Sequence, residues 1–326
     1  MLHLELRVPT PLTDQVVGLL CDDDTVTNVA VVPEAFRKPA GCLVLADVAR
    51  ENASVVVGRL KELGLEREGS IALLPLDTVL SDEADRAERA APGAPDDGVV
   101  WDAVEQRLRS ESRVTWVFLV FMTLAALIAG AGRILDQPIL IVGAMVVGPE
   151  FSPIAAICFA LARPRPALLP RAVLALVVGF GAAVAVSTAA WAVAYAAGAF
   201  SRHDASTGAL TDFIVKPDGW SFVVACLAGV AGTVSLTTNK SGPLVGVFIS
   251  ITTIPAVGTA AVCLAAGVWS EVGSAVVQLG INVAGLVLAG TLTMVVQRAV
   301  WSRVGVPRSA SGALRGARRG GSPTAR

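Results

Sequence analysis

The chain has 326 residues, of which 54% are hydrophobic and 16% are charged. This composition is typical of a multi-pass membrane protein and argues against a water-soluble one. Asp, Glu and Arg are frequent in residues 1–113, whereas residues 114–297 carry few charges outside predicted loops. We therefore expect a soluble N-terminal domain followed by a membrane domain.

The five cysteines indicate neither a structural disulfide nor a zinc site. None of them forms a CxxC pair, and none lies in a segment that we place outside the cell. The first residues follow a strand pattern and lack the basic and apolar regions of a cleaved signal peptide. No cofactor or metal is expected.

Residues 1–80 show the pattern of a small α+β domain. Apolar and polar residues alternate along residues 2–8, as in a half-buried strand. The elements predicted after it are a helix (10–23), two strands (25–32 and 41–49), a helix (52–65) and a strand (70–76). The order βαββαβ suggests a ferredoxin-like fold. Because some ligand-sensing domains share this layout, we weigh a ligand sensor against an oligomerisation or folding cap.

Two segments connect this domain to the membrane. Residues 81–98 are acidic and rich in Ala, Pro and Gly, which predicts a mobile linker. Residues 99–113 predict an amphipathic helix that lies along the inner membrane surface or forms the first turns of the first span. Its apolar face and its basic end consist of Trp101, Val104 and Leu108, then Arg107, Arg109 and Arg113.

Six apolar segments within residues 114–297 are long enough to cross a membrane. They are residues 114–131, 138–161, 172–199, 220–236, 243–268 and 275–296. Arginine and lysine are concentrated on the side that holds both chain ends, which predicts cytoplasmic termini. The preference for Arg over Lys and the abundant Ala suggest a bacterial protein, hence the inner membrane. The basic tail, residues 298–326, is expected to contact anionic lipid and not nucleic acid.

The second apolar segment contains "VVGPEFSPI" (146–154), which interrupts it near its middle. Gly148 is expected to end one half-helix, and Pro149 prevents its continuation. Ser152 is expected to cap a second half-helix, with Pro153 at its first position. Backbone groups freed at such a break require protein or water as partners, so the break is expected to face a cavity or a neighbouring span.

Glu150 is the acidic residue that we place within a span and not in a loop. Because an ionisable side chain at membrane depth is costly, it marks a functional site by default. It would act as a proton carrier or as a cation ligand beside exposed carbonyls. The alternative is that it accepts hydrogen bonds from the amides that open the second half-helix.

Six spans divide into two halves of three with opposite orientations. The fifth segment carries Pro255 near its middle, at the place that corresponds to the break in the second segment. Interrupted spans at matching places of two inverted halves indicate a transporter binding site. The fifth segment would add hydroxyls and the carbonyl of Ile251, although a proline kink can also be purely structural. The pathway residues predicted in this segment are Ser250, Thr252, Thr253, Pro255 and Gly258.

Two polar residues of the last segment, Gln278 and Asn282, are expected to form interhelical hydrogen bonds. Small residues in several segments would allow close helix packing, and the chain is expected to form a homo-oligomer.

Two stretches, "LIVGAMVVGPEFSPIAAICFAL" (140–161) and "GPLVGVFISITTIPAVGTAAV" (242–262), resemble a family of bacterial membrane proteins, the domain of unknown function 389. Members of that family are similar in a "GAM…P…P" block and a later "GV.I…..P..A..G" block. The likeness covers about residues 114–296. It implies a membrane architecture and singles out the two interruptions, but it implies no substrate.

Two functions remain open from the sequence. The first is a transporter or channel for an ion or small solute, with a pathway at the two interruptions. The second is a membrane-embedded sensor or scaffold whose N-terminal domain binds a ligand or partner. An enzyme is not expected, because the chain has only two histidines, His3 and His203, and lacks an HExxH motif, a P-loop and an intramembrane Ser-His pair.

Overall fold

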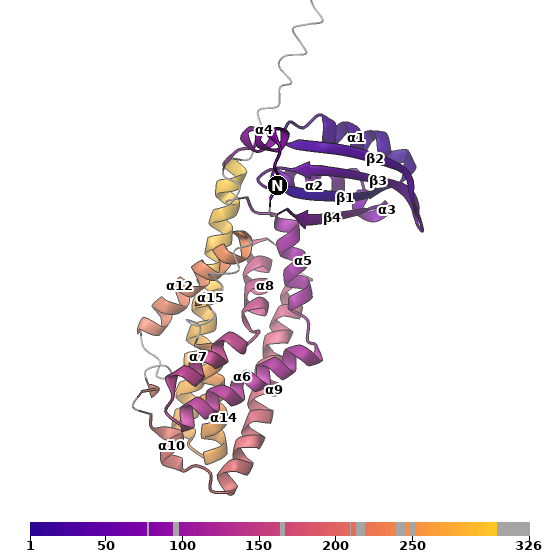
Figure 1. The fold of residues 1–326 in the computed structure, drawn as a ribbon. Helices are drawn as coiled ribbons and strands as arrows, with labels where there is room; N and C mark the ends of the chain where they lie inside the picture. The colour runs from indigo at the N-terminus through magenta and orange to yellow at the C-terminus, as the bar shows by residue number, and fades with distance from the viewer. Residues whose placement is uncertain are drawn as a thin grey trace, which may run out of the picture. The chain divides into compact units, whose positions relative to one another are not determined.

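The computed structural model describes residues 1–76, 78–93, 98–163, 167–208, 210–212, 219–238, 246–247 and 252–304. It divides into two compact units, with boundaries at Val100 and Trp101 and, near the end of the last helix, at Arg298 and Ala299. The first unit contains the N-terminal domain and the second contains the apolar helices (Figure 1).

The N-terminal unit has the element order that the sequence predicts. Its four strands form an antiparallel sheet in the order β2-β3-β1-β4. Its main elements are β1 (Leu2–Val8), α1 (Thr13–Cys21), β2 (Val26–Arg37), β3 (Ala40–Val48), α2 (Ala53–Glu62) and β4 (Ser70–Pro75). Two short helices, η1 (Thr10–Leu12) and α3 (Leu65–Glu68), lie in the connections. The order βαββαβ is thus confirmed.

The alternation along β1 explains the core of this unit. Every second side chain from Leu2 to Val8 is buried. The central strand β1 pairs with β3 and with β4, and its Leu4 lies opposite Ala46 and its Leu6 opposite Val44. Both helices cover the core with apolar side chains. Burial of an aliphatic side chain stabilises by about 1.5–3 kcal/mol, so this face holds the unit together.

The strand β2 is longer than the sequence predicts. It continues from Val32 through Pro33 to Arg37, with irregular register between Val32 and Phe36. Since β2 is the edge strand of the sheet, a proline without an N–H group is tolerated there.

The segment predicted as a linker contains a helix that its composition does not predict. This helix, α4 (Asp82–Ala90), begins at Ser81, whose hydroxyl accepts a hydrogen bond from the amide of Glu83 at 3.2 Å. Acidic residues in its first turn favour the helix start through the helix dipole. The amino group of Met1 lies 3.1 Å from Glu88 Oε1 and ties α4 to β1.

Glu51 is a buried carboxyl of this unit. Its side chain is 7% exposed, and neither of its carboxyl oxygens has a hydrogen-bond partner among the described residues. The chain on either side of it is fixed to the segment before α5, because Arg50 Nε donates to the carbonyl of Gly98 and Ser54 Oγ donates to that of Val99. Burial raises the pKa of Glu51, and the carboxylate of Glu88 acts in the same direction.

Glu51→Gln is expected to stabilise the N-terminal unit at neutral and basic pH. Because the pKa of this acid is higher in the folded than in the unfolded state, stability falls as pH rises from about 4.5 through the folded-state value. The Gln variant does not lose stability in this way, because glutamine does not ionise. Amide hydrogen exchange of β3 and α2 in the full chain should therefore be slower in the variant at about pH 8 and equal to wild type at about pH 4. An equal effect of the exposed control Glu5→Gln would contradict this expectation.

The second unit is helical. Its elements are α5 (Trp101–Glu111), α6 (Trp116–Ile134), α7 (Pro138–Val147), α8 (Phe151–Ala162), α9 (Leu169–Ala196), α10 (Arg202–Ser206), α12 (Gly219–Thr238), α14 (Thr253–Ala266) and α15 (Trp269–Val304). In the described part of the chain, α6, α9, α12 and α15 are long and apolar enough to cross a membrane, and α7 with α8 makes a fifth span if the bent pair is counted as one. Several apolar helices therefore suggest a membrane protein.

The fifth predicted span is described only in its second half. This half is α14, an apolar helix of 14 residues, which is shorter than a membrane crossing requires. It packs against α6 and α9. Most of the first half, from Pro243 to Ile251, lies outside the described residues.

The amphipathic helix before the first span is α5, and it is separate from α6. Thr115 begins a new helix, because its hydroxyl accepts a hydrogen bond from the amide of Phe118 at 3.1 Å. This excludes α5 as the first turns of α6. The predicted apolar face is buried, and the Trp101 ring lies 6.2 Å from that of Phe159 on α8. Protein, and not only lipid, therefore covers this face.

A buried ion pair holds the end of α6. Arg133 is 1% exposed and lies 2.8 Å from a carboxylate oxygen of Asp212. It also donates to Thr211 Oγ1, and that hydroxyl donates to Asp136. The last turn of α6 extends three residues beyond the end predicted at residue 131, and it includes Arg133.

Candidate functional site

The interruption predicted in the second span lies between α7 and α8. The helix α7 ends at Val147, and Gly148 is its C-cap with φ −68° and ψ 128°. Pro149 follows, and α8 begins at Phe151. The two helices are bent by 54° at this point. The break at Gly148 and Pro149 is confirmed.

The second half-helix starts earlier than predicted. Glu150 is the N-cap of α8, so Ser152 and Pro153 are its second and third residues. The prediction that Ser152 caps the helix with Pro153 at the first position is therefore wrong. The first four N–H groups of an α-helix have no partner within it, so proline is tolerated at the third position as well as at the first.

The side chain of Ser152 is bonded to the end of α5. Its hydroxyl donates to Glu111 Oε2 at 2.7 Å. Its carbonyl accepts a hydrogen bond from Ser112 Oγ at 3.4 Å. Ser152 thus fixes α8 to α5.

Glu150 is buried at the break. Its side chain is 3% exposed, and its Oε1 accepts a hydrogen bond from Thr253 Oγ1 at 2.8 Å. Its Oε2 has no hydrogen-bond partner among the described residues. The side chain does not cap α8, so the alternative that it accepts bonds from the amides of that helix is wrong.

Gly148 leaves the space that this carboxyl occupies. A Cβ at Gly148 would overlap Glu150 Oε2 and would lie 2.7 Å from Cγ1 of Ile254. Real Cβ atoms do not make such contacts, so any side chain at this position would displace the carboxyl of Glu150 and the side chain of Ile254.

The helix α14 begins in the same way as α8. Thr252 is its N-cap, Thr253 its first residue and Pro255 its third. Pro255 therefore lies in the first turn of a helix, as Pro153 does, and the prediction that it kinks the middle of a helix is wrong. Ser250 and Ile251, which we predicted at the same site, lie outside the described residues.

The hydrogen bond between Glu150 and Thr253 joins the N-terminal ends of two helices that are 103 residues apart in the chain. The N-terminal end of an α-helix carries a partial positive charge, which stabilises an anion beside it. The carboxyl of Glu150 lies at the start of α8 and contacts the first residue of α14. Both helix ends therefore act on one carboxyl group.

Two polar residues of α15 complete the arrangement. Asn282 Nδ2 donates to Thr252 Oγ1 at 2.6 Å, and Gln278 Nε2 donates to the same oxygen at 3.4 Å. Both side chains are at most 2% exposed. The prediction that they form interhelical hydrogen bonds is confirmed. We did not assign them to the site, although their spacing of four residues places them on one helix face.

We refer to Glu150, Thr252, Thr253, Gln278 and Asn282 as the polar cluster. Two of its oxygens, Glu150 Oε2 and Gln278 Oε1, are buried and have no donor among the described residues.

Residues 145–288 match the family model described as Domain of unknown function (DUF389). This part of the chain is similar to that family, and we refer to it as the DUF389 domain. The matched range includes the break, α8, α14 and the polar residues of α15, so the whole polar cluster lies within the DUF389 domain. The family description names no activity. No curated protein and no solved structure matches the chain.

Not every predicted pathway residue of the DUF389 domain belongs to the polar cluster. Gly148 lies beside it, whereas Ser152 contacts α5. Gly258 packs α14 against α6, because a Cβ there would lie 2.6 Å from that of Ala129. Within the described residues, no group of three or more His, Cys, Asp or Glu side chains is arranged to hold a metal ion.

The polar cluster of the DUF389 domain contains two buried acceptor oxygens that have no donor within the described ranges. Each unsatisfied buried oxygen costs about 1–3 kcal/mol, and more if it is charged. A proton or a small cation at Glu150 would remove that cost, and the amide oxygen of Gln278 is a suitable second ligand for a cation. The arrangement is thus chemically able to bind and release a positive charge.

Proposed function

We propose that the protein is a transporter or channel for an ion or small solute, with a pathway that passes the polar cluster. The observation that carries this proposal is the carboxyl of Glu150, which is buried between two helix ends with one oxygen unpartnered among the described residues. An intramembrane carboxyl of this kind is costly and marks an ion or proton pathway.

The geometry favours a proton or a monovalent cation as the ion. Both unpartnered oxygens of the polar cluster are hydrogen-bond acceptors, which attract positive charge. The positive ends of α8 and α14 would attract an anion, but the carboxyl of Glu150 already occupies that position. Broken helices near the middle of the membrane line the substrate and coupling-ion sites of many transporters.

In this proposal the chain crosses the membrane six times, in two inverted halves of three spans each. The bent pair α7–α8 and the segment that ends in α14 would be the middle spans of the two halves. The common first-turn proline of α8 and α14 supports the relation between them. Both termini would be cytoplasmic in a bacterial inner membrane, and the chain would form a homo-oligomer.

The test is ion flux in proteoliposomes that contain wild type or Glu150→Gln. Glutamine keeps an oxygen for the Thr253 hydroxyl but carries no titratable charge, so the flux should fall at least about tenfold and lose its pH dependence. The panel contains protons, Na⁺, K⁺ and Cl⁻. Ser152→Ala is the matched control, because Ser152 lies in the same break but contacts α5.

Two results would overturn the proposal. One is a flux in Glu150→Gln equal to that of wild type. The other is the absence of any flux in correctly folded wild type, which would favour the sensor or scaffold and would direct attention to ligands of the N-terminal domain.

A further inference from the structure

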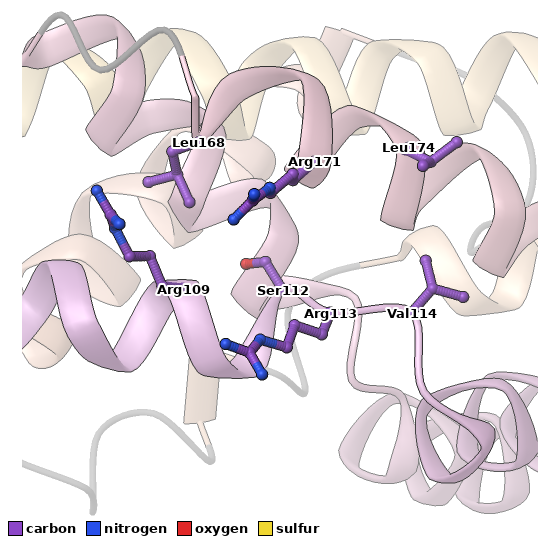
Figure 2. Close-up of a pocket in the computed structure, with 7 residues that line it drawn as sticks. All are labelled: Arg109, Ser112, Arg113, Val114, Leu168, Arg171 and Leu174. Carbon is purple, nitrogen blue, oxygen red and sulfur yellow. The ribbon is translucent and has the colours of Figure 1, made fainter.

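A second site lies away from the polar cluster, where the connection between α5 and α6 meets the start of α9. A pocket of about 220 Å³ opens there. Three arginines line it: Arg109 at the end of α5, Arg113 in the connection, and Arg171 in the first turn of α9 (Figure 2). All three are exposed.

The charge of this pocket is only partly compensated. The guanidinium of Arg109 is paired with Glu105 at 2.6 Å. Arg113 and Arg171 have no carboxylate partner among the described residues. Figure 2 shows the guanidinium of Arg171 directed toward Ser112. The N-terminal end of α9, a helix of 28 residues, adds partial positive charge to the same place.

The other end of the pocket is apolar. Val114 and Leu174 lie together there, away from Arg109 (Figure 2). Exposed apolar side chains continue from this point along α6 and α9, and they include Val117, 59% exposed, and Val177, 65% exposed. A basic recess that opens onto an apolar helix surface fits a molecule with an anionic head and a hydrocarbon tail.

We propose that this pocket binds the phosphate of an anionic membrane phospholipid, with the acyl chains against the apolar surface of α6 and α9. Arginine binds phosphate through its planar fork of N–H donors, and two unpaired guanidinium groups prefer a lipid with net negative charge over a zwitterionic one. This site is independent of the proposed transport function.

The experiment is native mass spectrometry of the full chain in detergent, titrated with phosphatidylglycerol, phosphatidylcholine of the same acyl chains, or inorganic phosphate. Wild type should bind phosphatidylglycerol at least about tenfold more tightly than phosphatidylcholine. The double variant Arg113→Gln/Arg171→Gln should lose most of that preference. The matched control is Arg107→Gln, because Arg107 is an exposed arginine of α5 that pairs with Glu111 and does not line the pocket.

A second variant distinguishes binding of the whole lipid from binding of a phosphate group alone. Leu174→Ser should weaken the binding of phosphatidylglycerol and leave that of inorganic phosphate unchanged, because Leu174 faces the apolar end of the pocket. The proposal is overturned if the double variant keeps the preference for phosphatidylglycerol, if Arg107→Gln loses it equally, or if inorganic phosphate displaces the lipid at similar concentration.

Discussion

Gly148→Ala is expected to destabilise the membrane domain and, on the transport function proposed above, to lower ion flux by about tenfold or more. The added Cβ would overlap Glu150 Oε2 and the side chain of Ile254. Because φ at Gly148 is −68°, alanine fits the backbone, and the whole effect is steric. Overpacking of this kind costs about 1–3 kcal/mol, and each 1.4 kcal/mol is about a factor of ten in an equilibrium.

The matched control for this variant is Gly143→Ala. Gly143 lies in the same helix, α7. Apart from its chain neighbours and the helix's own backbone, no atom of the described residues lies within 4 Å of a Cβ built there. Flux in proteoliposomes should be close to wild type in this control. Thermal unfolding in detergent should occur at the wild-type temperature or slightly above it, because alanine is favoured over glycine in a helix interior. If Gly148→Ala behaved like Gly143→Ala in both measurements, the tight space around the Glu150 carboxyl would have no role.

Gly258→Ala is the second variant for which we expect a large effect. Its Cβ would lie 2.8 Å from the carbonyl oxygen of Ala126 and 2.8 Å from the amide nitrogen of Gly130, both backbone atoms of α6. Backbone atoms cannot rotate away as a side chain can, so α14 and α6 would have to separate. The expected loss of unfolding free energy is about 1–3 kcal/mol, with a lower melting temperature in detergent.

The comparison for Gly258→Ala is Gly280→Ala in α15. In the described part of the chain, a Cβ at Gly280 has no atom within 4 Å other than those of its chain neighbours and its own helix backbone. Alanine in a helix interior is favoured over glycine by about 0.8–1 kcal/mol. The two substitutions should therefore change the melting temperature in opposite directions. A stabilisation by both would show that α14 and α6 do not pack as closely as the structure indicates.

Local sequence signals predicted the N-terminal domain well. The alternation along β1 depends on neighbouring residues only. The same is true of the helix predicted over 52–65, which the structure caps at Asn52 and follows with the left-handed Gly64. The helix α4 was missed because its acidic, alanine-rich composition is also that of a linker. Its Ser81 cap was the signal that could have identified it.

Only those parts of the candidate site that depend on neighbouring residues in the chain were predicted. Gly148 and Pro149 interrupt a helix whatever surrounds them, so the break is visible in the sequence. The role of Ser152 and the partners of Gln278 depend on which helices lie next to each other. No pattern within a single segment carries that information.

The hydrogen bond from Thr253 to Glu150 has a consequence for any movement of the protein. If α14 moves away from α8, Glu150 loses the one donor that it has among the described residues, and both carboxyl oxygens are then without partners. The position of α14 and the affinity of Glu150 for a proton or cation are therefore thermodynamically linked. By reciprocity, a proton or cation bound at Glu150 must change the equilibrium between α14 close to α8 and α14 moved away from it. The factor of this change equals the factor by which the movement changes the affinity of Glu150 for the proton or cation.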